Sequence, residues 1–323
     1  MKRILTPPSL VFGFFLLLFF SFSSCKSEPK KTTASPTLSF EFSLAQWSFN
    51  KSFREGGISP YEFAKMANEL GFKGLEYVSQ LYPDVIESDD KDAAIQVFVE
   101  KNNALAAQYQ MKNVLIMIDE EGNLSSSNEK ERMTAIENHK KWIAAAHQMG
   151  CSAVRLNLYG EKDPEKWIAN SIKSLKELSD YGSERSINVI VENHGRITSN
   201  IPFLMRAIND TQKANCGTLP DFGNFCIAED GYGSLSDGSC KEVYDPYKGV
   251  AEMMPKAFGV SAKSYDFDAD GNETTLDYYK LLSIVKEAGY NGFIGVEYEG
   301  HRLSEQEGIL ATKKLLENVA SKL

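Results

Sequence analysis

Residues 188–194 read Asn-Val-Ile-Val-Glu-Asn-His, and residues 217–224 read Gly-Thr-Leu-Pro-Asp-Phe-Gly-Asn. In both stretches a short apolar run, of the length typical of a buried strand, leads directly into acidic and polar side chains. Similar runs recur along the whole chain. The expected strands are 41–45, 74–78, 113–118, 153–158, 188–192, 217–221, 258–263 and 293–297.

Segments of helical periodicity separate these strands. The first begins at Ser59-Pro60, an N-cap followed by proline at the first helical position, and ends at Gly71. The others cover about 91–110, 128–149, 165–182, 199–209, 247–255, 275–288 and 304–322. Eight strand–helix units predict an α/β fold, a single-domain (β/α)8 TIM barrel. The rival, a doubly wound open sheet, should show a Gly-rich phosphate loop, and neither GxGxxG nor GxxxxGK[ST] occurs.

The composition is that of a globular, acidic protein. Of 323 residues, 42% are hydrophobic, and 35 Lys and Arg face 44 Asp and Glu, which gives a formal net charge of −9. This length and composition suffice for a large core and exclude a mostly disordered chain. Nucleic-acid binding requires clustered basic residues, so we expect no nucleic-acid partner.

The N-terminus is typical of a targeting signal. A basic start (Met1-Lys2-Arg3) precedes an apolar run over 10–20 that is too short for a transmembrane helix, and small residues then lead to Cys25. This resembles a bacterial lipoprotein signal, although Phe22 and Ser24 depart from its usual residues. We expect a signal peptide (1–24), a lipidated Cys25 with a flexible tether (25–38) and a barrel (39–323), exported and lipid-anchored to a bacterial membrane, periplasmic or at the cell surface. The alternative is an ordinary secretory signal with an incidental cysteine.

Four further cysteines follow. Cys226 and Cys240 flank a loop rich in Gly, Ser and Asp, and export would permit a disulfide between them. Cys151 and Cys216 fall at expected strand starts and are interpreted as buried free thiols. No Cys/His spacing indicates a zinc site.

Acidic residues gather where expected strands end. In a TIM barrel the C-terminal ends of all strands meet at one mouth, where function resides. Buried carboxylates there need a partner or a metal, and converging oxygen ligands suit Mg²⁺ or Mn²⁺. The alternative is a network of salt bridges with Arg155 and Lys263 and no metal. The acidic residues in question are Glu76, Glu192, Asp221 and Glu297.

Four motifs carry a resemblance to a known family. They are Leu-Ala-Gln-Trp at 44–47, Glu-Asn-His at 192–194, Asp-x-Gly-Asn at 221–224 and Val-Glu-Tyr at 296–298. In this order they resemble the xylose isomerase-like TIM barrels, which include sugar-phosphate isomerases and epimerases, ketose 3-epimerases, inosose dehydratases and endonuclease IV. The resemblance covers residues 40–320.

The resemblance implies a metal site. Glu192, Asp221 and Glu297 match three ligands of the ketose 3-epimerases, whereas Ser261 stands in place of a strand-7 His and Asn224 in place of a second His. The loss of imidazole ligands shifts the expected cofactor from Zn²⁺ toward Mn²⁺ or Mg²⁺. These departures also argue against endonuclease IV activity.

The implied chemistry is proton removal next to a sugar carbonyl. Glu192 and Glu297 would act as acid and base as well as metal ligands, and Lys263 would stabilise the developing enolate oxygen. Charge neutralisation for Arg155 and packing for Trp47 are the alternative roles. The expected substrate-binding residues are Trp47, Glu76, Arg155, His194, Asn224 and Ser261.

The loop 266–277 has the DxDxDG spacing of a calcium site. A strand leads into it, so one flanking helix of an EF-hand is missing. We therefore favour a strand–helix loop with an Asp-Gly turn, in which Thr274 caps the next helix and Asp277 completes a capping box.

Three functions remain open. The first is a metal-dependent sugar epimerase or isomerase, and the second is a lyase or dehydratase that cleaves 3-keto-glycosides by the same enolate chemistry. The third is a non-catalytic sugar-binding lipoprotein, which the missing strand-7 His favours. In each case the partner is a small carbohydrate, and the sequence does not indicate an oligomeric state.

Overall fold

The computed structural model describes residues 40–228, 235 and 240–323. The expected signal peptide, the lipidation of Cys25 and the tether lie outside the described residues and stay predictions. Within the described part of the chain, no helix combines the length and the apolar character needed to cross a membrane.

Eight parallel strands form the centre of the fold, as the sequence predicts. They follow the order β6-β5-β4-β3-β2-β1-β8-β7. Two isolated parallel bridges, Thr218–Ala257 and Asp221–Ser261, join β6 and the residues after it to β7 and the residues before it, which closes the barrel. The strands are β1 Glu41–Ala45, β2 Gly74–Val78, β3 Lys112–Ile118, β4 Ala153–Leu156, β5 Asn188–Glu192, β6 Cys216–Leu219, β7 Val260–Ser264 and β8 Phe293–Tyr298.

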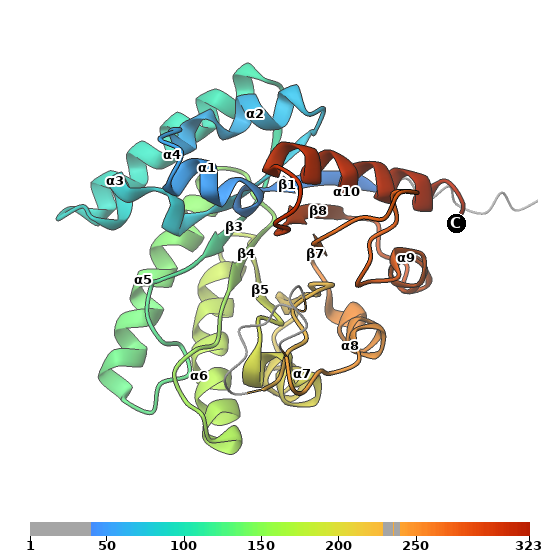
Figure 1. The fold of residues 1–323 in the computed structure, drawn as a ribbon. Coiled ribbons are helices and arrows are strands. Elements are labelled where there is room, and N and C mark those ends of the chain that lie inside the picture. The colour runs from blue at the N-terminus through green and yellow to red at the C-terminus, as the bar shows by residue number, and fades with distance from the viewer. Residues whose placement is uncertain (1–39, 229–234, 236–239) are drawn as a thin grey trace, which may run out of the picture. The chain divides into compact units, whose positions relative to one another are not determined.

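Helices surround the strands (Figure 1). The α-helices are α1 Asn50–Arg54, α2 Phe63–Glu69, α3 Pro83–Ile86, α4 Lys91–Gln108, α5 Glu129–Gln148, α6 Pro164–Ser183, α7 Ile201–Asn209, α8 Pro246–Met253, α9 Tyr278–Glu287 and α10 Glu305–Ala320. Short 3-10 turns are η1 Gln46–Phe49, η2 Pro60–Glu62, η3 Ser79–Leu81, η4 Arg196–Ser199 and η5 Met254–Lys256. Every expected helix is present, and α1 and α3 are additional short helices in strand–helix loops.

Aromatic side chains seal part of the layer between strands and helices. Phe98 of α4 makes edge-to-face contacts with Tyr77 of β2 and Trp142 of α5, at centroid distances of 5.9 and 5.3 Å. All three side chains are fully buried. Such packing fixes the strands relative to the helices and gives the barrel mouth a rigid base.

Some expected boundaries were wrong by a few residues. β6 ends at Leu219 rather than Asp221, because Pro220 has no N–H to continue the ladder. α9 begins at Tyr278, because the Glu273 carboxylate accepts the backbone N–H groups of Thr275 and Leu276. Its N-cap is Asp277, which accepts from Lys280 N at 3.0 Å, so the expected cap at Thr274 is incorrect.

The 266–277 loop does not gather its acids around one centre. Asp266 pairs with Arg302, whereas Asp268 accepts the backbone N–H groups of Asp270 and Asn272 at 2.9 and 2.8 Å. Among the described residues, the one acidic cluster close enough to hold a metal lies elsewhere. The favoured interpretation, a strand–helix loop, therefore agrees with the structure.

The disulfide that the sequence left open is present in the structure, and the two expected buried thiols are found. Cys226 and Cys240 form a disulfide, and the free thiols of Cys151 and Cys216 are buried. The disulfide lies beside an antiparallel bridge between Cys226 and Val243. It therefore fixes the start of the long segment between β6 and α8.

Candidate active site

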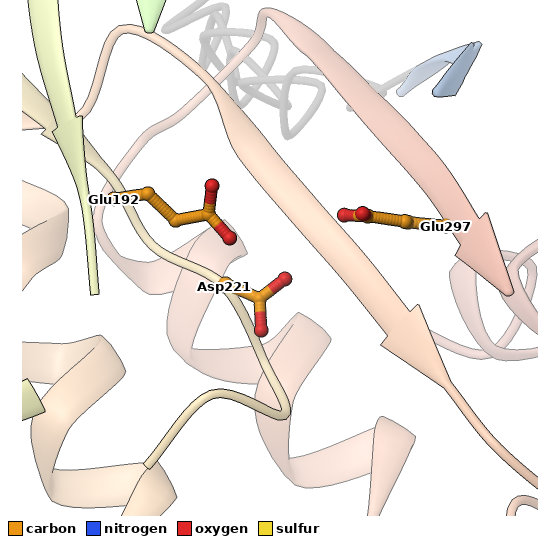
Figure 2. Close-up of side chains that lie close together, drawn as sticks. All are labelled: Glu192, Asp221 and Glu297. Atoms are coloured by element: carbon orange, nitrogen blue, oxygen red, sulfur yellow. The ribbon is translucent and has the colours of Figure 1, made fainter. Parts of the chain in front are cut away.

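Three carboxylates from separate strands converge at the barrel mouth. Glu192 ends β5, Asp221 follows β6, and Glu297 lies near the end of β8. Each offers an oxygen that lies within 4.8 Å of the others, and all three side chains are buried. Figure 2 shows Glu192 and Glu297 approaching from opposite sides, with Asp221 beside Glu192. The predicted convergence is confirmed.

The turn after β6 holds Asp221 in place. The backbone N–H groups of Gly223 and Asn224 donate to Asp221 Oδ1 at 2.9 and 2.8 Å. Asn193, directly after β5, accepts from Asp221 N and donates to the Asp221 carbonyl. The Asp-x-Gly-Asn motif thus forms a turn that fixes one carboxylate oxygen and leaves Oδ2 directed toward β7.

Ser261 joins two of the carboxylates. Its Oγ lies 2.6 Å from Asp221 Oδ2 and 2.8 Å from Glu297 Oε2. A hydroxyl has one proton, so it can donate to only one of these oxygens at a time. Ser261 therefore holds the two carboxylates close together without neutralising either.

Cations reach the cluster from two sides. Arg155 Nε lies 2.8 Å from Glu192 Oε2, and Asn224 Nδ2 donates to Glu192 Oε1 at 3.0 Å. Lys263 Nζ lies 3.1 Å from Glu297 Oε1 and 3.9 Å from Asp221 Oδ2. The salt bridges of the alternative interpretation are therefore present alongside the convergence.

These cations do not balance the acids that surround them. Arg155 also pairs with Asp119, at 2.8 Å, and Lys263 with Glu299, at 3.2 Å. The two cations thus face five carboxylates, namely Asp119, Glu192, Asp221, Glu297 and Glu299.

The excess of acidic over basic groups is reflected in the pKa values of Asp221 and Lys263. Burial raises the pKa of Asp221 well above its usual range, and Glu192 and Glu297 add to the effect. Burial also disfavours the charged form of Lys263, but Glu297 and Glu299 outweigh it and raise the pKa of the ammonium. Burial would raise the pKa of Glu297, yet Lys263 and Ser261 hold it below its ordinary value. The centre therefore favours additional positive charge.

A polar chain leads from Glu192 toward His194. Asp119 links Arg155 to Asn157, whose Nδ2 donates to Asp119 Oδ1 at 2.6 Å. The Oδ1 of Asn157 lies 3.0 Å from His194 Nδ1. His194 is therefore connected to Glu192 through other side chains.

Glu76 and Trp47 lie at the edges of the site. Glu76 points into the barrel, where Ser43 Oγ donates to its Oε1 at 2.5 Å and a Cβ on Gly295 would lie 2.5 Å from its Oε2. Burial raises the pKa of Glu76 to about 8. Trp47 Nε1 donates to Glu299 Oε1. The substrate-binding roles predicted for these residues stay predictions.

Asp119 and Glu299 are members of the site that the sequence did not assign. Asp119 directly follows β3, and an acidic residue at a strand end is the same signal that marks the other acids of the mouth. Glu299 directly follows β8, which ends at Tyr298. Both could have been found by applying one rule to every strand.

A comparison with known families places the chain in one of them. The family model described as Xylose isomerase-like TIM barrel matches residues 64–319. The chain belongs to this family.

Solved structures of low sequence identity share the fold. The structure of 3-keto-D-glucoside 4-epimerase from E. coli matches with a TM-score of 0.64 at 13% identity, covering 87% of this chain and 100% of that one. A xylose isomerase-like barrel from Mycobacterium smegmatis, in complex with magnesium, matches with a TM-score of 0.61 at 18% identity, covering 88% and 98%. At these identities the likeness establishes the fold.

One curated relative shares a local stretch of sequence. It is the C-glycoside deglycosidase alpha subunit of Arthrobacter globiformis, 38% identical over 66 residues. The match spans 20% of this chain and 19% of the relative, so this chain covers about a fifth of the relative's length.

Proposed function

We propose that this protein is a divalent-metal-dependent enzyme that removes a proton next to the carbonyl of a keto sugar, as an epimerase or isomerase. The observation that carries the proposal is the buried trio Glu192, Asp221 and Glu297, whose oxygens lie within 4.8 Å of one another. Structural neighbours that include a sugar epimerase support the substrate class.

The residues present fit a divalent cation. Glu192, Asp221 and Glu297 would hold it, and their excess of negative charge over Arg155 and Lys263 favours its binding. An all-oxygen donor set suits Mn²⁺ or Mg²⁺ better than Zn²⁺. When bound, the metal would polarise the sugar carbonyl as a Lewis acid.

The protein's own groups then manage the proton. Glu192 and Glu297 approach from opposite sides, so one can remove a proton from carbon and the other can return one on the other face (Figure 2). Lys263 lies 3.1 Å from Glu297, where its ammonium can stabilise negative charge on a neighbouring oxygen. Removal and return on opposite faces invert the carbon centre.

Hydrogen exchange tests this proposal. Keto sugars incubated in D₂O with Mn²⁺ should gain deuterium next to the carbonyl, detected by NMR. Glu192→Gln should slow the exchange by about 10²-fold or more, because it removes an acid/base group. The matched control is Glu317→Gln, on the exposed face of α10. Absence of exchange with every keto sugar would reject the proposal, and a Glu192→Gln variant that binds sugar normally would then favour a non-catalytic binder.

Glycoside cleavage is the second candidate. The local match to a C-glycoside deglycosidase subunit favours it. If a leaving group lies β to the carbonyl, loss of the same proton expels that group instead of inverting the centre. Incubation with a 3-keto-glycoside separates the two, because cleavage releases the aglycone whereas epimerisation retains it.

We also propose that the protein is exported and lipid-anchored through Cys25. The support is the basic start, the apolar run and the cysteine at its end. Expression with radiolabelled palmitate should label the wild type and not Cys25→Ser. Equal labelling of both would refute the anchor.

A further inference from the structure

A cavity of ≈ 620 Å³ opens beside the candidate site. Its walls come from the segments that follow β4, β5 and β6, so it lies at the same end of the barrel as the carboxylates. The volume falls within the roughly 300–1,000 Å³ typical of small-molecule sites. Its wall residues include Tyr159, Asn200, Phe203 and Ile227.

His194 links the cavity wall to the carboxylates through side-chain contacts. Tyr159, a wall residue, has its hydroxyl 2.8 Å from His194 Nδ1. The same nitrogen lies 3.0 Å from Asn157, which connects through Asp119 and Arg155 to Glu192. Gly195, another wall residue, lies only three positions after Glu192 in the chain, so a ligand longer than one ring can extend from the carboxylates toward the cavity.

The far wall is held rigidly. Arg196 N donates to the Cys226 carbonyl at 2.8 Å, which ties the segment after β5 to the segment after β6. Ile227 N donates to the Glu242 carbonyl at 2.9 Å, next to the Cys226–Cys240 disulfide. A wall fixed in this way is preformed and lowers the entropic cost of binding.

The backbone beside His194 is also constrained. Gly195 and Arg196 both have positive φ angles, of +83° and +53°. A positive φ in a non-glycine residue costs energy and persists where surrounding contacts fix it, which occurs most often at binding sites. Here Ser199 Oγ accepts from Gly195 N at 2.7 Å and fixes the turn.

The wall chemistry suits a second ring. Tyr159 and Phe203 are aromatic wall residues and Ile227 is an aliphatic one, whereas Asn200 is polar and lies among several charged wall residues that suit hydroxyl groups. We propose that this cavity binds the second ring of a glycoside, a sugar or an aromatic aglycone, while the keto sugar lies at the carboxylates. The inference rests on the proposed function for the position of the keto sugar, and it names a glycoside rather than a free monosaccharide as the substrate class.

Binding of unoxidised glucosides tests the cavity without turnover. Isothermal titration calorimetry would compare methyl β-glucoside, phenyl β-glucoside and cellobiose on the purified protein. Either two-ring ligand should bind at least about tenfold more tightly than methyl β-glucoside, because its second ring buries apolar surface. Tighter binding of cellobiose indicates a second sugar, and tighter binding of phenyl β-glucoside indicates an aromatic aglycone.

A pair of variants locates the effect. Ile227→Trp narrows the cavity. In this variant the affinity for the two-ring ligands should exceed that for methyl β-glucoside by less than about twofold. The control is Leu310→Trp on the exposed face of α10, which should retain the preference. Equal binding of all three ligands, no binding by either two-ring ligand, or an unchanged preference in Ile227→Trp would each overturn the inference. Deuterium exchange is measured separately, so failure of the proposed function and failure of the cavity assignment give different results.

Discussion

The ammonium of Lys263 lies beside carboxylates that would also bind a metal, so the two cations would compete for the same negative charge. This ammonium lies 3.1 Å from Glu297 and 3.2 Å from Glu299, and it is fully buried. Lys263→Met keeps most of the side-chain length and removes the charge. We predict that the variant binds Mn²⁺ about tenfold more tightly, because the carboxylates lose a competing cation, while deuterium exchange falls by about 10²-fold.

Metal titration and exchange kinetics check this prediction together. The exposed Lys176→Met serves as the matched control and should change neither quantity. Weaker or unchanged Mn²⁺ binding in Lys263→Met would mean that the ammonium does not compete for the metal ligands.

Glu76 gives the stability of the protein a defined pH dependence. Burial raises its pKa to about 8. An acid whose pKa is raised on folding stabilises the folded state while it is protonated, and this contribution is lost as pH rises from its ordinary pKa toward about 8. Over that window the wild type should lose up to about 1.4 kcal/mol of unfolding free energy per pH unit through this group.

Urea unfolding in chelator, at several pH values between 5 and 9, measures this contribution. Glu76→Gln carries no ionisable group, so the difference between wild type and variant isolates Glu76 from Asp221. The prediction fails if the two proteins show parallel pH profiles.

Individual residues of the site were predictable to different degrees. Glu192, Asp221 and Glu297 could be identified because each follows an apolar run that had to be a buried strand. Their partners could not, because the pairing of Lys263 with Glu299 depends on how far each strand extends into the mouth. The bridging position of Ser261 likewise follows from the closure of β6 onto β7 rather than from local sequence.

At the scale of elements, the Glu76 side chain of β2 reaches past β1 to Gly295 of β8. A Cβ on Gly295 would lie 2.5 Å from Glu76 Oε2, so Gly295→Ala must displace a buried carboxyl. We expect a loss of about 1–3 kcal/mol in unfolding free energy. In a Glu76→Ala background the same substitution should cost at least about 1 kcal/mol less, because the clash is gone. Additive effects in this double-mutant cycle would show that the clash does not set the cost.

The disulfide stabilises the segment between β6 and α8. It joins residues separated by 14 positions, and a loop of this length corresponds to about 3 kcal/mol in the chain-entropy model. Replacing Cys226 and Cys240 together by Ser should lower the unfolding free energy by about 2–3 kcal/mol. Dithiothreitol should destabilise the wild type and leave the double variant unchanged; equal sensitivity of the two would contradict this role.

The boundaries of an element could be predicted where the sequence itself contains the signal that ends it. β5 was predicted with its observed ends, because its apolar run stops at Glu192. The start of α9 was missed because the Glu273 side chain binds two backbone N–H groups and delays the helix. A helix former in sequence can therefore lie in a turn when a nearby carboxylate satisfies the backbone first.

At the scale of the molecule, eight strand–helix units were enough to predict the barrel. That count implied a closed barrel, but it did not show how the β6 and β7 regions would join. They join through isolated bridges and three backbone hydrogen bonds. These bonds run from Ser261 N to the Pro220 carbonyl, from Phe222 N to the Ser261 carbonyl and from Phe258 N to the Thr218 carbonyl. This junction brings Asp221 beside Ser261. The site thus depends on the place where the barrel closes.

The central claim is that the trio of carboxylates binds one divalent cation. Calorimetric titration of chelator-treated protein with Mn²⁺ tests it most directly, with Asp221→Asn as the variant and the exposed Asp270→Asn, in the 266–277 loop, as the control. We predict one Mn²⁺ per chain in the wild type and in Asp270→Asn, and affinity at least about 10²-fold weaker in Asp221→Asn. A wild type that binds no Mn²⁺, or an Asp221→Asn variant that binds it as tightly as the wild type, would contradict the account.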